Sequence, residues 1–126
     1  MSHPSDTELA ILKSLWSRSP RSARDIHEEA GAALGWTLSS TRTTLARMVG
    51  KGLLVEGREG GARTYAPAQT KARTMAGLMR RFARRVLELD GPVPTSAFTG
   101  SAVLDADELA EIDAILSELD ESGDDA

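Results

Sequence analysis

The sequence has 126 residues, of which 40% are hydrophobic and only five are aromatic. This length and composition suit one small helical domain or one module with an appendage. The absence of cysteine excludes disulfides and thiolate metal sites. Neither a signal pattern nor an apolar run of the roughly 18 residues of a membrane span is found, so we expect a cytoplasmic protein with no membrane partner, no metal and no cofactor. The net charge of −4 is uneven: residues 1–68 carry +2, residues 69–90 carry +4 and residues 91–126 carry −10. This basic front keeps nucleic-acid binding open despite the acidic total.

A helix is predicted at the start of the chain. Ser5 followed by Glu8 forms a capping box, in which the serine oxygen accepts an unpaired amide and the glutamate reaches back. Apolar residues recur at 3–4 spacing as far as Trp16, and Pro20 ends the element. The apolar stripe indicates a face turned toward a core.

A second, shorter helix is predicted over residues 23–30. Ser22 with an acidic residue three positions on repeats the start signal. We expect His27 to face solvent rather than to bind a ligand. Trp36 stands just before the next cap and is predicted to be a buried plug.

The stretch from Thr37 to Gly52 reads as a third helix with two unlike faces. Its inward stripe comprises Leu38, Thr41, Leu45, Met48 and Val49, and its outward side comprises Ser39, Ser40, Arg42, Thr43 and Arg47. No carboxylate occurs in these sixteen residues, although a surface helix in an acidic protein normally mixes its signs. The outward face therefore predicts a polyanionic partner, double-stranded DNA.

After this helix the pattern becomes extended. Residues 53–58 and 63–66 form two short runs around Glu59-Gly60-Gly61-Ala62, and Gly-Gly supplies the positive φ angles of a tight hairpin turn. Three helices followed by a hairpin predict a winged helix-turn-helix over residues 1–68, in a fold that is mostly α with a small β-hairpin. In that architecture the third helix enters the major groove and the hairpin reaches the flanking backbone.

The predicted DNA-binding residues combine forked cations with short hydroxyls, which suit base edges and phosphates. They are Ser39, Ser40, Arg42, Thr43, Arg47, Lys51, Arg58 and Arg63. Alternatives remain open: Arg47 could brace the third helix internally, and Thr41 and Thr44 could be packing residues. The two hairpin arginines could only pair with Glu56 and Glu59.

Residues 69–126 are predicted to form a C-terminal helical dimerisation region with an acidic tail at 120–126. A long amphipathic helix is expected over residues 68–89, a break at 91–94, one helical turn within 95–100, and a last helix opened by Asp105 and Glu108. The long helix carries a basic face of Lys71, Arg73, Arg80, Arg81, Arg84 and Arg85. This face is either solvated or neutralises the acidic rear of a partner subunit or the DNA backbone.

The apolar stripes of these two helices exceed what a two-helix appendage can bury alone, so we predict a homodimer. The predicted dimerisation residues are Met75, Leu78, Met79, Phe82, Val86, Leu109, Ile112 and Leu116. Catalytic patterns are poor: Gly57 to Gly61 lacks a following GK[ST] and a helix, and the C-terminal carboxylates have no histidine or serine partner. We therefore predict no enzyme.

Several short runs of residues carry a family resemblance. They are Ser5-Asp6-Thr7-Glu8-Leu9-Ala10-Ile11-Leu12 with Leu15-Trp16, then Trp36-Thr37 ahead of Thr43-Thr44-Leu45-Ala46-Arg47-Met48 and Lys51-Gly52-Leu53, and finally Arg63-Thr64-Tyr65 with Leu104-Asp105-Ala106-Asp107-Glu108-Leu109. Over residues 5 to about 119 the chain resembles the penicillinase repressor family (BlaI/MecI/CopY type). The resemblance implies a dimeric winged-helix transcriptional repressor on a palindromic operator, with β-lactam-resistance or cell-envelope genes under control and Thr43 and Arg47 on DNA.

The resemblance also implies release of repression by a sensor protease, which cuts between an asparagine and a phenylalanine. Ungapped counting back from Leu104 places that bond at Ala97-Phe98, where the phenylalanine is present and the asparagine is not. The missing asparagine argues against this cleavage, and the missing cysteines exclude copper sensing through the C-terminal motif of the CopY branch. Two other functions stay open: a winged-helix module that binds protein, and a regulator that responds to a small molecule.

Overall fold

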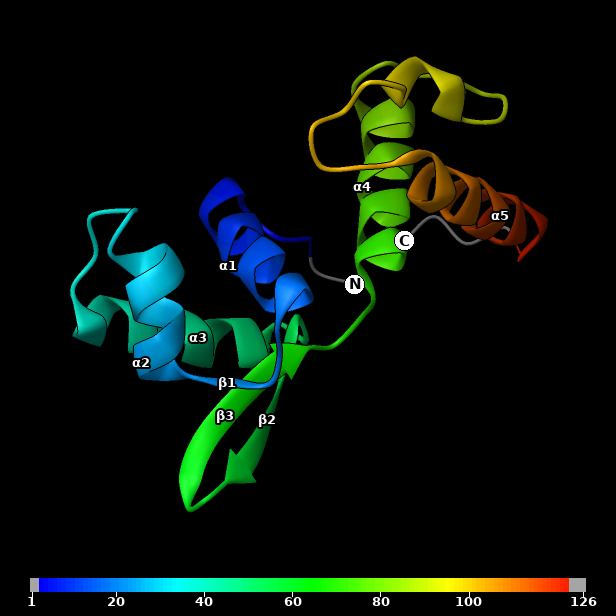
Figure 1. The fold of residues 1–126 in the computed structure, drawn as a ribbon. Coiled ribbons are helices and arrows are strands. Elements are labelled where there is room, and N and C mark those ends of the chain that lie inside the picture. The colour runs from blue at the N-terminus through cyan, green and yellow to red at the C-terminus, as the bar shows by residue number, and fades with distance from the viewer. Residues whose placement is uncertain (1–2, 123–126) are drawn as a thin grey trace. The chain divides into compact units, whose positions relative to one another are not determined.

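The computed structural model describes residues 3–122, and the chain divides after Thr70 into an N-terminal unit and a C-terminal unit (Figure 1). The N-terminal unit holds α1 (Asp6–Ser17), β1 (Arg21–Ser22), α2 (Ala23–Ile26), the π-helical turn η1 (His27–Gly31), α3 (Leu38–Gly50), β2 (Leu54–Glu59) and β3 (Ala62–Pro67). The C-terminal unit holds α4 (Lys71–Arg85), the 3-10 turn η2 (Thr95–Phe98) and α5 (Ala106–Ser122). Each unit is described by itself.

The predicted capping box at the start of α1 is confirmed. The Glu8 backbone N–H donates to Ser5 Oγ at 3.3 Å, and the Ser5 backbone N–H donates to Glu8 Oε1 at 2.9 Å. The two bonds satisfy amides that a helix start leaves unpaired. The inward stripe of α1 is buried, with Ile11 and Leu15 fully inaccessible to solvent.

The second helix is continuous through α2 and η1, and it ends one residue beyond the predicted 23–30. The prediction that His27 faces solvent is wrong: the side chain is half-buried, and its Nδ1 shares a 2.8 Å hydrogen bond with Thr41 Oγ1 of α3. This bond joins the two helices of the helix-turn-helix. Gly31 permits their close approach, because a Cβ there would collide with Thr41 Oγ1 and lie 2.6 Å from His27 Nδ1.

The third helix has the two faces that its sequence predicts. Thr37 caps it, with Oγ1 accepting the Ser40 N–H at 3.0 Å. The buried positions are Thr41, Thr44, Leu45 and Met48, while Leu38 and Val49 are half-buried. The two threonines are therefore packing residues, and the hydroxyl and arginine side chains of the opposite face point to solvent.

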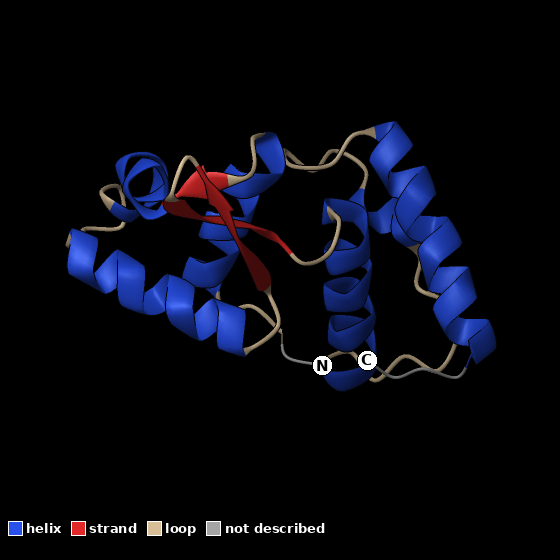
Figure 2. Cartoon of the chain, turned by 90° about the horizontal axis from the view of Figure 1, so that it is seen from below, coloured by secondary structure: helices blue, strands red, loops and turns tan. Residues whose placement is uncertain are grey.

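The hairpin is confirmed and gains a third strand. β2 and β3 pair antiparallel about Gly60 and Gly61, whose φ angles of 58° and 82° are the positive values that the Gly-Gly turn predicted. The additional strand, β1, pairs with β3 and completes a sheet of order β1-β3-β2, drawn in red in Figure 2. With α1, α2 and α3 beside it, this sheet makes the unit a winged helix-turn-helix.

One apolar cluster holds the N-terminal unit together. It combines the stripe of α1 with Ile26, Leu45, Met48 and Tyr65, each less than 5% exposed. Trp36 packs against this cluster but remains half-buried, so the predicted plug is only partly covered. Contributions from α1, α2, α3 and β3 to one core fix the third helix relative to the hairpin.

In the C-terminal unit, α4 is shorter than the predicted 68–89. It starts at Lys71, because the Ala68 N–H donates to Leu53 O at 3.0 Å and keeps that residue at the base of the hairpin. It ends at Arg85. One face of α4 packs against Ile112 and Leu116 of α5, both of which are buried.

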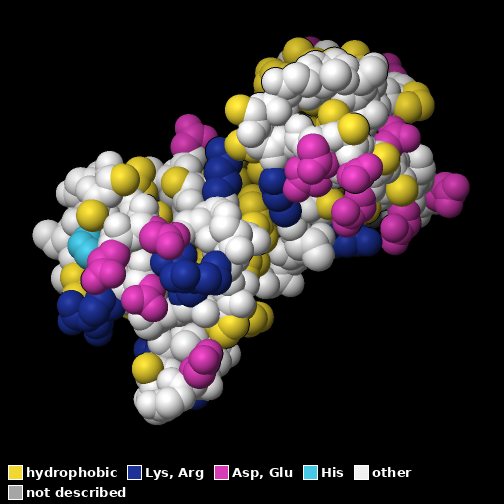
Figure 3. Space-filling model, viewed as in Figure 1, with side chains coloured by type: hydrophobic (Ala, Val, Ile, Leu, Met, Phe, Trp, Pro, Cys, Tyr) yellow, Lys and Arg dark blue, Asp and Glu magenta, His cyan; other side chains and the backbone are white. Residues whose placement is uncertain are grey.

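Four of the six cations on the basic face of α4 are paired with carboxylates of α5 in the same chain, which neither of our two alternatives anticipated, while Arg81 and Arg85 are exposed to solvent as the first alternative has it. The ion pairs are Lys71–Glu108 at 2.8 Å, Arg73–Glu118 at 3.5 Å, Arg80–Asp120 at 3.4 Å and Arg84–Asp120 at 3.3 Å. Arg80, which the helical pattern assigns to the solvent face, is buried at 6% exposure. The acidic side chains that make these pairs belong to α5, over which Asp and Glu gather (magenta in Figure 3).

The residues predicted for dimerisation divide into two groups. Met75, Met79, Ile112 and Leu116 are buried in the α4–α5 packing of one chain. Phe82 and Val86 are 46% and 62% exposed, and Leu78 and Leu109 are half-buried. An apolar surface on α4 thus stays open after the unit has formed its own core.

The Ala97-Phe98 bond lies in η2, the helical turn predicted within residues 95–100. Ala97 is exposed and donates its N–H to Pro94 O at 3.0 Å, while Phe98 is half-buried. The predicted acidic tail begins inside α5, which continues through Ser122, and its remaining residues, 123–126, lie outside the described part of the chain.

Candidate nucleic-acid interface

The outward face of α3 exposes hydroxyls beside a guanidinium group. Ser39, Ser40, Arg42 and Thr43 are all exposed. Thr43 Oγ1 donates to Ser39 O at 3.1 Å, and the Thr37 hydroxyl donates to Ser40 Oγ at 3.0 Å. Both acceptors belong to α3, so the hydroxyl oxygens retain acceptor capacity on a surface without carboxylates.

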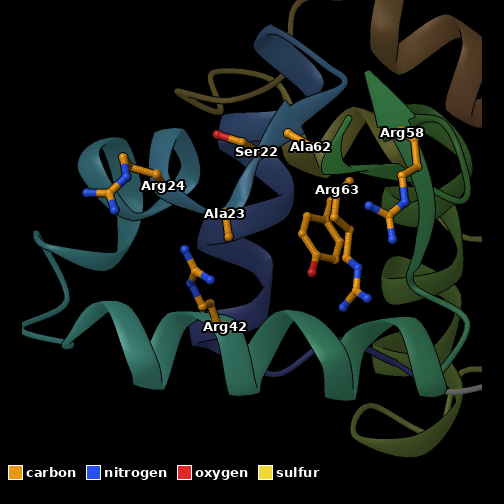
Figure 4. Close-up of a pocket in the computed structure, with 8 residues that line it drawn as sticks. Ser22, Ala23, Arg24, Arg42, Arg58, Ala62 and Arg63 are labelled. Atoms are coloured by element: carbon orange, nitrogen blue, oxygen red, sulfur yellow. The ribbon is translucent and has the colours of Figure 1, made fainter. Parts of the chain in front are cut away.

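An open cleft of about 620 Å³ lies between α2, α3 and the hairpin (Figure 4). Its lining comprises Ser22, Ala23, Arg24, Arg42, Arg58, Ala62, Arg63 and Tyr65. Four of these eight side chains are guanidinium groups and none is a carboxylate. We call this feature the arginine cleft.

The four arginines of the cleft differ in their partners. Arg58 Nη1 donates to Gly61 O at 3.1 Å, and Arg63 Nη1 lies 3.8 Å from Glu56 Oε1. Within residues 3–122, the side chains of Arg24 and Arg42 have no hydrogen bond or ion pair. The alternative that the hairpin arginines pair with hairpin glutamates is therefore correct for Arg63 and Glu56. Arg24 and Arg42 keep all their side-chain donors for a ligand.

The hairpin register concentrates positive charge at the cleft. Arg58 of β2 and Arg63 of β3 are directly opposite partners in the sheet. Like charges at opposite positions destabilise a sheet, and an anion bound between them would relieve that repulsion. The arrangement suits a phosphate, whose oxygens accept from forked guanidinium donors.

Arg24 is the cleft residue that sequence reasoning missed. It stands on α2 in the run Ala23-Arg24-Asp25-Ile26-His27-Glu28-Glu29, where one arginine is followed by three carboxylates. Such a run reads as an ordinary solvated helix face. Only the tertiary fold brings Arg24 beside Arg42, because α2 and α3 cross at their close approach near Gly31.

The C-terminal end of α3 has a different environment from its beginning. Lys51 Nζ donates to Glu8 Oε1 at 2.6 Å, and Arg47 Nε lies 3.6 Å from Glu8 Oε2. Glu8 is 1% exposed, whereas the Arg47 side chain is 58% exposed. The Nε of Arg47 thus braces α3 against Glu8 of α1, as the alternative proposes. The rest of the Arg47 side chain faces solvent.

The electrostatics of this group favour a charged Glu8. Burial raises the pKa of its carboxyl, but hydrogen bonds from Lys51 and the Ser5 amide, together with the Lys51 charge, outweigh burial and leave the pKa below its ordinary value. At neutral pH the site therefore contains a carboxylate between two cations. We call Glu8, Arg47 and Lys51 the Glu8 cluster.

A second ion pair, between buried Arg21 and exposed Glu29, serves structure rather than binding. Arg21 is 4% exposed and donates to Glu29, to Ser14 Oγ at 3.0 Å and to Asp25 O at 3.0 Å. Hydrogen bonds from Arg21 and then Ser14 hold the pKa of Glu29 below its ordinary value. This network ties α1 to α2 from the side of β1, so Arg21 is committed to internal contacts.

A winged helix-turn-helix with a basic cleft at its recognition helix defines a class of nucleic-acid-binding folds. Comparison with known proteins then gives the family: a model described as "Penicillinase repressor" matches residues 4–118. The chain belongs to the penicillinase repressor family.

Two kinds of relative are similar to the chain. "Transcriptional regulator BlaI" of Mycobacterium tuberculosis (strain H37Rv) is 35% identical over 75 residues, which cover 59% of this chain and 54% of that protein. "Penicillinase repressor" of Bacillus licheniformis is 30% identical over 63 residues, which cover 50% of this chain and 49% of that protein. The chain spans about half the length of the curated relatives it matches.

None of the helices in residues 3–122 is long and apolar enough to cross a membrane. In the same residues, no three His, Cys, Asp or Glu side chains are grouped so that they could hold a metal ion.

Proposed function

We propose that this protein is a cytoplasmic, sequence-specific DNA-binding transcriptional repressor and not an enzyme. The observation that carries the proposal is the arginine cleft, in which two guanidinium groups that have no partner among residues 3–122 adjoin the carboxylate-free face of α3. Membership of the penicillinase repressor family supports it, as do the names of the relatives. The N-terminal unit is the proposed DNA-binding domain.

In the proposed complex, α3 lies in the major groove and the hairpin follows the adjacent backbone. Ser39, Ser40 and Thr43 approach base edges or phosphates, and Arg47 forks toward a base with its exposed end. The four arginines of the cleft neutralise phosphates. Lys51 contributes mainly through its bond to Glu8.

We further propose that the C-terminal unit forms a homodimer, so that two recognition helices meet a palindromic operator. The surface that supports this proposal is apolar and exposed, with Phe82 and Val86 at its centre and Leu78 beside them. β-Lactam-resistance or cell-envelope genes are the targets that the family resemblance suggests. We leave a sensor protease out of the proposal, because Ala97 replaces the expected asparagine.

The test is a DNA-binding titration of the full chain. A duplex selected by the protein from a randomised palindromic pool is compared with an unrelated duplex of equal length, by fluorescence anisotropy at several salt concentrations. The logarithm of the binding constant should fall linearly with the logarithm of salt, with a slope of about −0.9 for each phosphate neutralised. No binding at low salt, or binding indifferent to salt, would reject the proposal and favour a protein-interaction module.

A further inference from the structure

We propose that Glu8 is a positioning residue that sets sequence discrimination: it neutralises Lys51, holds the Nε of Arg47, and so keeps the C-terminal end of α3 from binding DNA indiscriminately. The inference rests on the proposed DNA-binding function. Glu8 belongs to α1 and does not lie on the exposed face of α3. Its role would therefore be exerted through the two cations that it contacts.

The geometry of the Glu8 cluster carries the first step. The Glu8 carboxylate is almost fully buried, and its two oxygens have different tasks. Oε1 accepts from the Ser5 amide at 2.9 Å and from Lys51 Nζ at 2.6 Å, while Oε2 lies 3.6 Å from Arg47 Nε. Because the capping box fixes the carboxylate on α1, the two cations have a fixed counter-charge.

The second step follows from charge. A cation that already has a buried anionic partner gains little by approaching a phosphate, because it must share or leave that partner. Lys51, at 31% side-chain exposure, is in this situation. Arg47 is bound only through Nε, so its terminal nitrogens can still fork toward a base from a restricted position.

The third step compares the two ends of α3. Arg42 at the beginning has no internal partner in the described chain, so its charge is fully available to any DNA sequence. The Glu8 cluster at the other end contains two cations and one anion. Attraction that is independent of sequence should thus come from the arginine cleft, and Arg47 should contribute discrimination.

The test replaces the carboxylate by its neutral analogue in the full chain. Glu8→Gln keeps an oxygen that can accept from the Ser5 amide, and Glu28→Gln removes one negative charge at an exposed position of the same unit as the matched control. Binding is measured on the selected duplex and on the unrelated duplex across a salt series. Circular dichroism checks that each variant is folded.

Glu8→Gln should steepen the salt slope on the unrelated duplex by about 0.9 for each cation released. Near 0.1 M salt, one such cation corresponds to roughly an eightfold rise in affinity for that duplex. The ratio of affinities for the selected and unrelated duplexes should fall, and Glu28→Gln should leave slope and ratio unchanged. Equal effects of the two variants would overturn the proposal.

A second variant keeps the test decisive if Glu8→Gln does not fold. Lys51→Gln should change the salt slope by much less than Arg42→Gln, which should reduce its magnitude by about 0.9. An equal reduction by both variants would mean that Lys51 binds phosphate freely, and the proposal would be wrong. Failure of the wild-type chain to bind either duplex at low salt would instead reject the proposed function itself.

Discussion

The two units of this protein differ in how far their cationic side chains are paired with carboxylates. In the N-terminal unit, Arg24 and Arg42 line a cleft without a carboxylate and have no internal partner within residues 3–122. In the C-terminal unit, Lys71 and Arg84 are paired with acidic residues of α5. In the first unit, unpaired cations gather in one cleft beside α3, which suggests an anionic ligand. In the second unit most cations of α4 are paired and an apolar surface is exposed, which suggests self-association.

The largest expected effect is on self-association. Phe82→Glu places a charge in the exposed apolar surface of α4, and in a symmetric dimer the change occurs twice. Loss of about 2 kcal/mol per copy should raise the dimer dissociation constant roughly 1000-fold in analytical ultracentrifugation. Arg81→Glu, at an exposed neighbouring position on the same helix, should change it by about fivefold or less. A monomeric wild-type chain, or a Phe82→Glu variant that dimerises as well as the wild type, would contradict a dimer interface at this apolar surface.

Next in size is the effect of removing the free cations of the arginine cleft. The double variant Arg24→Gln/Arg42→Gln should weaken DNA binding roughly 60-fold near 0.1 M salt, because two phosphate contacts are lost. The matched control is Arg81→Gln/Arg85→Gln, which removes two exposed arginines of α4 and should cost about twofold or less. Equal losses in an anisotropy titration would show that charge in either unit attracts DNA alike.

A smaller effect is expected where η1 packs closely against α3. Gly31→Ala should destabilise the fold by about 2 kcal/mol, because its Cβ would collide with His27 and Thr41. Gly50→Ala on α3 is the control: no heavy atom lies within 4 Å of its added Cβ, so it should stabilise by about 0.5–1 kcal/mol. Urea denaturation measures both, and a neutral Gly31→Ala would mean that the helix-turn-helix can open at this contact.

The sequence predicts much of this fold because several local signals agree. The capping box at Ser5, the two-faced third helix and the Gly60-Gly61 turn each act over a few residues, and all three are confirmed. β1 could not be predicted, since two residues carry no alternating pattern and exist as a strand only through β3. Arg80 was assigned to solvent because helical periodicity gives its face but not the partner, Asp120, that makes its burial tolerable.

The site shows the same limit more sharply. The hydroxyls and Arg42 on α3 could be found from the absence of carboxylates nearby. The partner of Lys51 could not, because Glu8 is 43 positions away in the sequence and reads there only as a helix cap. Arg24 likewise belongs to the site through tertiary packing alone.

The smallest expected effect is on stability in acid. The pKa of Glu8 is lowered from 4.5, as is that of Glu108 in the C-terminal unit, chiefly through a hydrogen bond from Lys71. A lowered pKa means that the carboxylate stabilises the fold above its unfolded pKa and that this contribution is lost as the pH falls through the folded value. The free energy of unfolding should therefore fall as the pH decreases below about 5, where these carboxyls begin to bind protons in the unfolded chain.

Two single variants assign that acid sensitivity to the two units. Glu8→Gln should flatten the dependence more than Glu108→Gln, because Glu8 is buried and Glu108 retains about a third of its side-chain exposure. Urea denaturation at several pH values measures both slopes. A dependence as steep in Glu8→Gln as in the wild type would show that this carboxylate is not held by Lys51 in solution.

We propose above all that DNA binds to the arginine cleft and α3 of the N-terminal unit and not to the basic face of α4, where four of the six cations are paired. An NMR titration of the full chain with the selected duplex tests it most directly, with side-chain signals of Arg42 and Arg84 as the two reporters. We predict large chemical-shift changes for Arg42 and its neighbours on α2 and the hairpin, and none for Arg84. Shifts confined to α4 would contradict it.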